Sequence, residues 1–263
     1  MAANTRSGPE RESGAEHGLR RPGRSLLWTE PARSAAELGS VGALLPRLRR
    51  APRGDGHHVV VFPGLMASDN STRVLRWYLR DLGYQSHGWE LGVNIGPTDR
   101  ILDGIVQRVR SLYAIDNAPV SLVGWSLGGV FAREIARILP SCVRCVITLG
   151  SPFAMTHREQ SNARAAYNMV STFHSSRVDA IRRPENERPR ITVPTTAIYS
   201  KQDGIVPWRA CVDEPGARAE NIRVVGSHTG LGHNPQVLLI IADRLAQPVG
   251  GWTPYAARHR HAT

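Results

Sequence analysis

The chain has 263 residues, of which 41% are hydrophobic, and a formal net charge of +11 at pH 7. No apolar run reaches the roughly 18 residues of a transmembrane helix, and the first residues lack the apolar core of a secretory signal, so we expect a cytoplasmic protein. The length fits one domain of ordinary α/β size.

The positive charge is carried almost entirely by arginine, because Lys201 is the only lysine, and these residues are spread along the chain. No nucleic-acid-binding module accompanies them, so nucleic acid is not an expected partner. The charge is more consistent with weak association with an anionic membrane surface. Three cysteines cannot form a disulfide framework. Cys142 and Cys145 lead into an apolar strand rather than a helix N-terminus, so we expect them to be structural.

The N-terminal part of the chain differs in composition from the rest. Residues 1–24 are rich in Arg, Glu, Gly and Ser, which predicts a disordered basic tail. Residues 25–56 are predicted to form an N-terminal helical segment of one or two helices that end in a loop, with Pro31 and Pro46 expected to break them.

Strand and helix patterns alternate from residue 57 to about residue 250, and a tail follows over 251–263. This alternation predicts an α/β fold with a mostly parallel central sheet and helices on both faces. The predicted strands are 57–62, 84–88, 120–124, 143–149, 195–200 and 221–225. The predicted helices between them are 71–82, 97–113, 128–139 and 235–245. Residues 151–194 interrupt the alternation where a short cap or lid insertion is expected.

The segment from Gly124 to Gly128 has the pattern G-x-S-x-G between a predicted strand and a predicted helix, with Ser126 at its centre. The chain turns so sharply there that the serine takes a strained backbone conformation, and side chains at the two glycine positions are expected to collide. The hydroxyl is exposed above a helix N-terminus, whose dipole favours a developing negative charge. Ser126 is therefore the predicted nucleophile, the alternative being a chance match in a glycine-rich chain.

A serine nucleophile requires a histidine base that is itself oriented by a carboxylate. In this architecture the acid and the histidine follow the serine in that order, each after a strand. Asp203 follows the fifth predicted strand and is favoured over Asp213, which lies in a sequence typical of an exposed turn. His228 follows the last strand and is favoured over His233, which directly precedes the last helix. His57 and His58 lie at the start of the first predicted strand, at the wrong end of the sheet.

Acyl transfer places negative charge on a carbonyl oxygen, which backbone N–H groups can stabilise. One expected donor is Leu127, directly after the nucleophile. The other is Leu65, in the turn after the first strand, where Gly64 allows a close approach; a plain strand-to-helix turn is the alternative. The candidate pocket-lining side chains, for which core packing is the alternative, are Met66, Trp125 and Trp208.

Four motifs in this order resemble those of the α/β-hydrolase superfamily, and more closely its small lipase and esterase members. They are the elbow GWSLGG, the PGL turn, the acid loop YSKQDGIVP and the histidine loop GSHTGLGHNP. The resemblance covers about residues 57–246. It implies a triad of Ser126, Asp203 and His228, with Leu65 and Leu127 as oxyanion donors.

The histidine loop favours His228, because an aliphatic segment like the following Thr229-Gly230-Leu231 is found in small bacterial lipases. One departure lies in the oxyanion turn, where many relatives have His-Gly and this chain has Pro63-Gly64. A backbone donor survives that change.

The resemblance implies an α/β-hydrolase domain over residues 57–250, with residues 151–194 as a cap that could shield an acyl chain. The expected activity is cleavage of carboxylic esters through an acyl-enzyme, on a small-molecule or lipid-like substrate and without a metal or organic cofactor. An acyltransferase or thioesterase would use the same triad. A non-catalytic binding protein is less favoured, because degenerate members usually lose a triad residue.

Overall fold

The computed structural model describes residues 19–155, 161–176, 183–214 and 216–255. Six strands form one sheet in the order β2-β1-β3-β4-β5-β6, and every neighbouring pair is parallel. The strands are β1 His58–Phe62, β2 Gln85–Gly88, β3 Val120–Trp125, β4 Val143–Leu149, β5 Thr195–Ser200 and β6 Ala219–Val224. The predicted α/β class and parallel sheet are confirmed, with strand ends moved by at most two residues.

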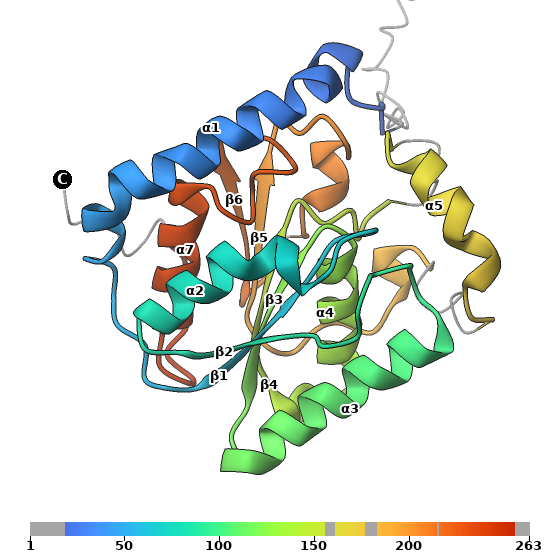
Figure 1. The fold of residues 1–263 in the computed structure, drawn as a ribbon. Coiled ribbons are helices and arrows are strands. Elements are labelled where there is room, and N and C mark those ends of the chain that lie inside the picture. Colours follow the sequence, from blue (N-terminus) through green and yellow to red (C-terminus); the bar gives the residue numbers. More distant parts are fainter. Residues whose placement is uncertain (1–18, 156–160, 177–182, 215, 256–263) are drawn as a thin grey trace, which may run out of the picture.

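Helices cover both faces of this sheet (Figure 1). They are α1 Arg24–Leu48, α2 Arg73–Asp81, α3 Asp99–Asp116, α4 Leu127–Ile138, α5 Arg164–Val170 and α7 Pro235–Leu245. The first, second and last of these pack on one face, while α3 and α4 pack on the other. Successive residues of a strand point to opposite faces, so Val59 and Val61 join the first core, and Val60 and Phe62 join the second.

The register of the parallel strands brings the loops of the candidate site to one edge of the sheet. Phe62 pairs with Gly124, and Trp125 pairs with Leu149. On the other side of β4, the last residues of β5 and β6 pair with each other as well. The segments after β1, β3, β5 and β6 therefore leave the sheet together, at its carboxyl edge.

The N-terminal helix corrects one expectation. α1 is a single helix of 25 residues that contains both Pro31 and Pro46, whereas the sequence predicted breaks there. A proline inside a helix removes a backbone donor and crowds the preceding turn. Side-chain donors support that turn, since Thr29 donates to the carbonyl of Leu26 (3.2 Å) and Arg33 donates to the same oxygen (2.9 Å). The far half of α1 is held by burial of side chains against α7.

The predicted cap is described in part. Its described portion contains α5 and the short 3-10 helices Ser171–Phe173 and Glu185–Glu187, while residues 156–160 and 177–182 lie outside the described residues. Most of the predicted N-terminal tail and the end of the C-terminal tail also lie outside them. Within the described ranges, no helix combines the length and the apolar composition needed to cross a membrane.

Candidate active site

Ser126 occupies the sharp turn between β3 and α4. Its backbone has φ 53° and ψ −122°, a combination that side-chain-bearing residues rarely adopt because of steric crowding. The turn is held from both sides: Ser126 N donates to Leu149 O at 2.8 Å, and Gly129 N donates to Ser126 O at 3.0 Å. The residue is partly exposed.

The two glycines of the motif are required for different reasons. A Cβ added at Gly124 would lie 2.3 Å from Gly129 Cα, across the turn. A Cβ added at Gly128 would lie 2.4 Å from the carbonyl oxygen of Phe62, at the end of β1. The expected collision across the turn is thus found at Gly124, while Gly128 is instead fixed by the neighbouring strand.

Asp203 and His228 form a buried pair. Asp203 Oδ2 lies 2.5 Å from His228 Nδ1, and the two residues are 3% and 5% exposed. The other oxygen, Oδ1, accepts hydrogen bonds from the N–H groups of Ile205 and Val206, each at 2.8 Å. One oxygen therefore anchors the carboxylate to its own loop, while the other orients the imidazole.

The environment of His228 favours its protonated form. Burial acts against the positive charge, but the charge and hydrogen bond of Asp203, with a contribution from Glu30, outweigh it and raise the pKa of His228 above the ordinary histidine value. A base of this kind accepts a proton more readily than a free histidine does.

Ser126 and His228 each lie against the end of β4. Leu149 accepts from Ser126 N, and a Cβ added at the next residue, Gly150, would lie 3.1 Å from His228 Nδ1. Trp125, directly before the serine, donates from its indole to the backbone oxygen of His228 at 3.0 Å. Neither His228 nitrogen is hydrogen-bonded to Ser126 Oγ in the described structure; such bonds are often longer without substrate and tighten when it binds.

The turn after β1 lies directly over the nucleophile. A Cβ added at Gly64 would be 3.3 Å from Ser126 Cβ and 3.9 Å from its Oγ. Met66 N donates to Asn94 O (2.7 Å) and is committed to that bond. Among the described residues, the N–H groups of Leu65 and Leu127 have no such acceptor, so neither is committed to another backbone bond.

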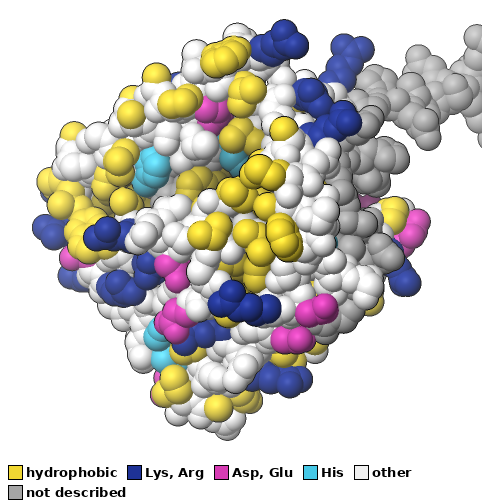
Figure 2. All heavy atoms as spheres, turned by 45° about the vertical axis from the view of Figure 1, so that its right-hand side comes forward, with side chains coloured by type: hydrophobic (Ala, Val, Ile, Leu, Met, Phe, Trp, Pro, Cys, Tyr) yellow, Lys and Arg dark blue, Asp and Glu magenta, His cyan; other side chains and the backbone are white. Residues whose placement is uncertain are grey.

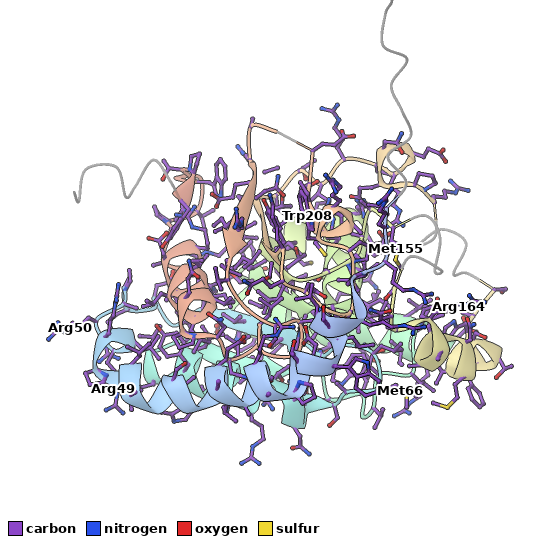
Figure 3. The ribbon with its side chains drawn as sticks, turned by 90° about the horizontal axis from the view of Figure 1, so that it is seen from above. Arg49, Arg50, Met66, Met155, Arg164 and Trp208 are labelled. Atoms are coloured by element: carbon purple, nitrogen blue, oxygen red, sulfur yellow. The ribbon has the colours of Figure 1, made fainter. Side chains whose placement is uncertain are left out.

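The three candidate pocket residues lie in different surroundings. Met66 is 45% exposed and has φ 60°, in the turn after β1. Trp125 packs under the histidine loop. Trp208 stacks on Tyr199, with a centroid distance of 5.6 Å, beside the acid loop. Figure 3 shows Met66 and Arg164 on the same side of the molecule, far from Arg49 at the end of α1.

The two alternatives to the predicted acid and base have other partners. Asp213 accepts from Arg133 at 2.6 Å and from Thr195 at 3.1 Å. His233 lies 3.0 Å from Ser34 O of α1. The structure therefore brings Asp203 together with His228 and places the other two elsewhere.

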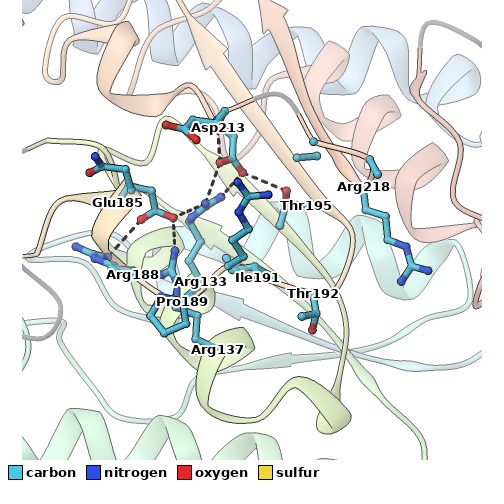
Figure 4. Close-up of a pocket in the computed structure, with 16 residues that line it drawn as sticks. Arg133, Arg137, Glu185, Arg188, Pro189, Ile191, Thr192, Thr195, Asp213 and Arg218 are labelled. Atoms are coloured by element: carbon cyan, nitrogen blue, oxygen red, sulfur yellow. Dashed lines mark hydrogen bonds and ion pairs between the residues drawn. The ribbon is translucent and has the colours of Figure 1, made fainter.

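Asp213 belongs to a charged cavity of about 350 Å³ at the opposite edge of the sheet, where β5 and β6 begin (Figure 4). Arg133 is 3% exposed there and also pairs with Glu185 at 2.6 Å. Figure 4 shows these arginines and carboxylates directed at one another. The network holds residues 185–191 against α4, at a distance from Ser126.

A second hydrogen-bonded chain of serine, histidine and aspartate occurs at the same edge of the sheet, where the strands begin. Ser121 Oγ lies 2.8 Å from His57 Nε2, and the Nδ1 of the same ring is bonded to Asp55. Ser121 lies inside β3 with no exposed surface, next to Cys145 Sγ at 3.4 Å. Burial lowers the pKa of His57. The contrast shows that accessibility and the helix N-terminus, rather than the three residue types, distinguish the site at Ser126.

Sequence reasoning missed two carboxylates of α1 that contact the histidine loop. Glu30 is 3% exposed and accepts from His228 N at 2.9 Å, and Glu37 accepts from Ser227 N at 2.7 Å. The available signal was their helical spacing, since they share one face with the buried Val41 and Leu48. Acidic residues on the apolar stripe of a helix require buried partners. Within the described residues, no group of three His, Cys, Asp or Glu side chains could hold a metal ion.

The parallel sheet, the elbow and the loops at its carboxyl edge define an α/β-hydrolase fold. Residues 55–231 match the family model described as the PGAP1-like alpha/beta domain. Because the match covers more than half of the chain, the protein belongs to that family. No curated protein matches the sequence.

Several solved structures share the fold at low sequence identity. Aspergillus fumigatus lipase B is 18% identical with a TM-score of 0.58, and the match covers 75% of this chain and 54% of that one. This chain therefore spans about half of that lipase. Bacillus licheniformis lipase BlEst2 in its mature form is 15% identical with a TM-score of 0.53, covering 74% and 93%. A structure of the metagenome-derived lipolytic enzymes LipS and LipT is 17% identical with a TM-score of 0.54, covering 74% and 93%.

Proposed function

We propose that this protein is a serine hydrolase that cleaves carboxylic esters. Ser126 is the nucleophile, His228 the general base and Asp203 the group that orients it. The observation that carries the proposal is the buried pair of Asp203 and His228, 2.5 Å apart, beside a partly exposed serine with a strained backbone.

The reaction proceeds in two halves. Ser126 Oγ attacks the ester carbonyl while His228 Nε2 takes its proton, and the oxyanion accepts hydrogen bonds from the N–H groups of Leu65 and Leu127. Collapse of this intermediate breaks the ester C–O bond, and the departing alcohol takes the proton from His228. Water then gives a proton to His228 and attacks the acyl carbonyl; the bond from the acyl carbon to Ser126 Oγ breaks, the acid leaves, and His228 returns the proton to Oγ.

The surface near the site suits a lipid-like acyl group. Met66 is 45% exposed, while Met169 and Phe173 of the cap are 63% and 64% exposed. The cap lies close to the oxyanion turn, because His174 Nε2 is 3.1 Å from Ile95 O and the adjacent Asn94 binds Met66 N. In Figure 2 the α5 side of the molecule is turned forward. Hydrophobic side chains gather near the centre of the face seen there.

The net charge of +11 supports weak association with anionic membranes. A cytoplasmic protein that binds such a membrane has access to lipid substrates. Sedimentation with vesicles of anionic lipid, compared with vesicles of phosphatidylcholine alone, tests this. Equal sedimentation with both would contradict it.

The activity is tested with p-nitrophenyl esters of graded acyl length. We expect turnover by the purified chain and loss of at least about 10³-fold in Ser126→Ala. The matched control is Ser121→Ala, which removes the serine of the buried chain and should leave turnover unchanged. Adding alcohol or thiol acceptors distinguishes an acyltransferase from a hydrolase by its products. Ester binding without turnover would support a non-catalytic protein and contradict the proposal.

A further inference from the structure

Glu30 of α1 is a buried carboxylate with four hydrogen-bond donors from the two catalytic loops. Oε1 accepts from Gly204 N at 2.8 Å and from His228 N at 2.9 Å. Oε2 accepts from both the backbone N–H and the hydroxyl of Thr229, each at 2.9 Å. Glu30 precedes residue 55, where the match to the family model begins, so this carboxylate lies outside the matched domain.

These contacts join the acid loop to the base loop. Gly204 directly follows Asp203, and His228 is itself the proposed base. The two loops leave different strands, so the 2.5 Å separation of Asp203 and His228 depends on how the loops are held relative to each other. A single carboxylate that accepts from both loops fixes that relation.

The chemistry of the contact distinguishes it from ordinary helix packing. Two apolar surfaces could pack here without a charge, whereas a buried carboxylate is stable only when hydrogen bonds replace its hydration. Burial acts to raise the pKa of Glu30, but the bonds from Thr229, His228 and Gly204 outweigh it and lower the pKa, so the group is ionised at neutral pH. Arg33 pairs with the same carboxylate at 3.0 Å and also donates to Gln202 O of the acid loop.

We propose that Glu30 is a positioning residue for the hydrolase, holding the acid loop and the base loop in register from a helix outside the matched domain. The inference rests on the proposed function, since it assigns a role toward that same site. Among the described residues, no hydrogen bond joins Glu30 to Ser126 or to the turn after β1, so it acts through the geometry and the charge around His228.

Two charged groups act directly on His228: Asp203 of the acid loop bonds its Nδ1, and Glu30 of α1 accepts from its N–H. The neighbouring charged and titratable groups have other partners, since Arg33 pairs with Glu30, Glu37 accepts from Ser227 N, and His233 bonds to Ser34 O. Neutralising Glu30 removes one of the negative charges that favour the protonated imidazole. Because the base must be neutral to act, the acidic limb of the rate profile then moves to lower pH.

The experiment compares Glu30→Gln and Glu30→Ala with the wild-type chain. Glu30→Gln keeps the shape and one acceptor oxygen, so we expect the order wild type, Gln, Ala in kcat, with a loss of about 10- to 100-fold in Glu30→Gln. KM for a short ester should stay nearly constant, and the acidic limb of kcat/KM should shift downward. The matched control is Glu37→Gln on the same helix. Its carboxylate accepts from Ser227 N and, among the described residues, from no donor of the acid loop, so kcat should change by less than about threefold.

Two measurements by NMR do not depend on turnover. Amide exchange at Gly204, His228 and Thr229 should be faster in Glu30→Gln, and the imidazole of His228 should titrate at lower pH. If wild-type protein lacks esterase activity, the proposed function fails while these measurements still test the contact. The inference would be overturned if a folded Glu30→Gln protein kept the wild-type kcat, the wild-type acidic limb of kcat/KM, the wild-type amide exchange rates and the wild-type titration of His228.

Discussion

Asp203 and His228 lie on loops that leave neighbouring parallel strands, with Oδ2 of the first 2.5 Å from Nδ1 of the second. The second oxygen of Asp203 is held by two N–H groups of its own loop. Asp203 thereby occupies Nδ1 of His228, and Nε2 has no hydrogen-bond partner among the described residues. The orientation of the base is thus set by a carboxylate that is itself fixed.

Replacing this carboxylate should cost catalysis more than stability. Asp203→Asn keeps an acceptor oxygen for Ile205 and Val206 but loses the charge and favours the wrong tautomer of His228. We expect kcat to fall by about 10³- to 10⁴-fold with little change in KM. Steady-state kinetics with a short ester measure this, and thermal melting serves as the control for folding. A kcat within threefold of wild type would contradict the role of Asp203.

The raised pKa of His228 predicts the pH dependence of the reaction. The base acts when neutral, so kcat/KM should rise with pH along an acidic limb whose midpoint lies above the ordinary histidine pKa of about 6.5. The same measurement on Asp203→Asn should show the limb at lower pH, because the charge that favours protonation is gone. A wild-type limb below the ordinary value would show that a different group controls the rate.

The strained backbone of Ser126 should oppose stability. At φ 53° and ψ −122° a glycine is unstrained, whereas alanine keeps the crowding of the serine. Ser126→Gly should therefore have a free energy of unfolding about 1–2 kcal/mol above that of Ser126→Ala, while both lack activity. Denaturant unfolding of the two variants tests this. Equal stabilities would mean that the turn carries no strain.

Gly124 should tolerate no side chain. In Gly124→Ala the new Cβ would meet backbone atoms that cannot rotate away, so we expect a loss of about 2 kcal/mol or more in unfolding free energy. The matched control is Gly39→Ala, on an exposed position of α1 where a Cβ meets nothing within 4 Å. That change should stabilise the protein by about 0.5–1 kcal/mol. A neutral Gly124→Ala would contradict the packing of the elbow.

The strands and the elbow could be predicted because their signals are local. Runs of β-branched residues mark the buried strands, and the pattern around Ser126 is confined to five residues. Asp203 and His228 followed from chain order and from their positions after strands. Each of these inferences required only short stretches of sequence.

Glu30 could not be found in that way, since its partner Gly204 is 174 residues further along the chain. The continuity of α1 through Pro31 has a similar origin. Local propensity predicts a break at a proline, but contacts with distant loops and with α7 stabilise the unbroken helix. Features that depend on such tertiary contacts lie beyond the reach of a local pattern.

The central claim is that Ser126 is an activated nucleophile. Incubating the purified chain with a fluorophosphonate and locating the adduct by peptide mass spectrometry tests it most directly. We predict one covalent adduct on Ser126, its loss in Ser126→Ala, and normal labelling in Ser121→Ala. Folded wild-type protein that stays unlabelled, or an adduct at another residue, would contradict the account.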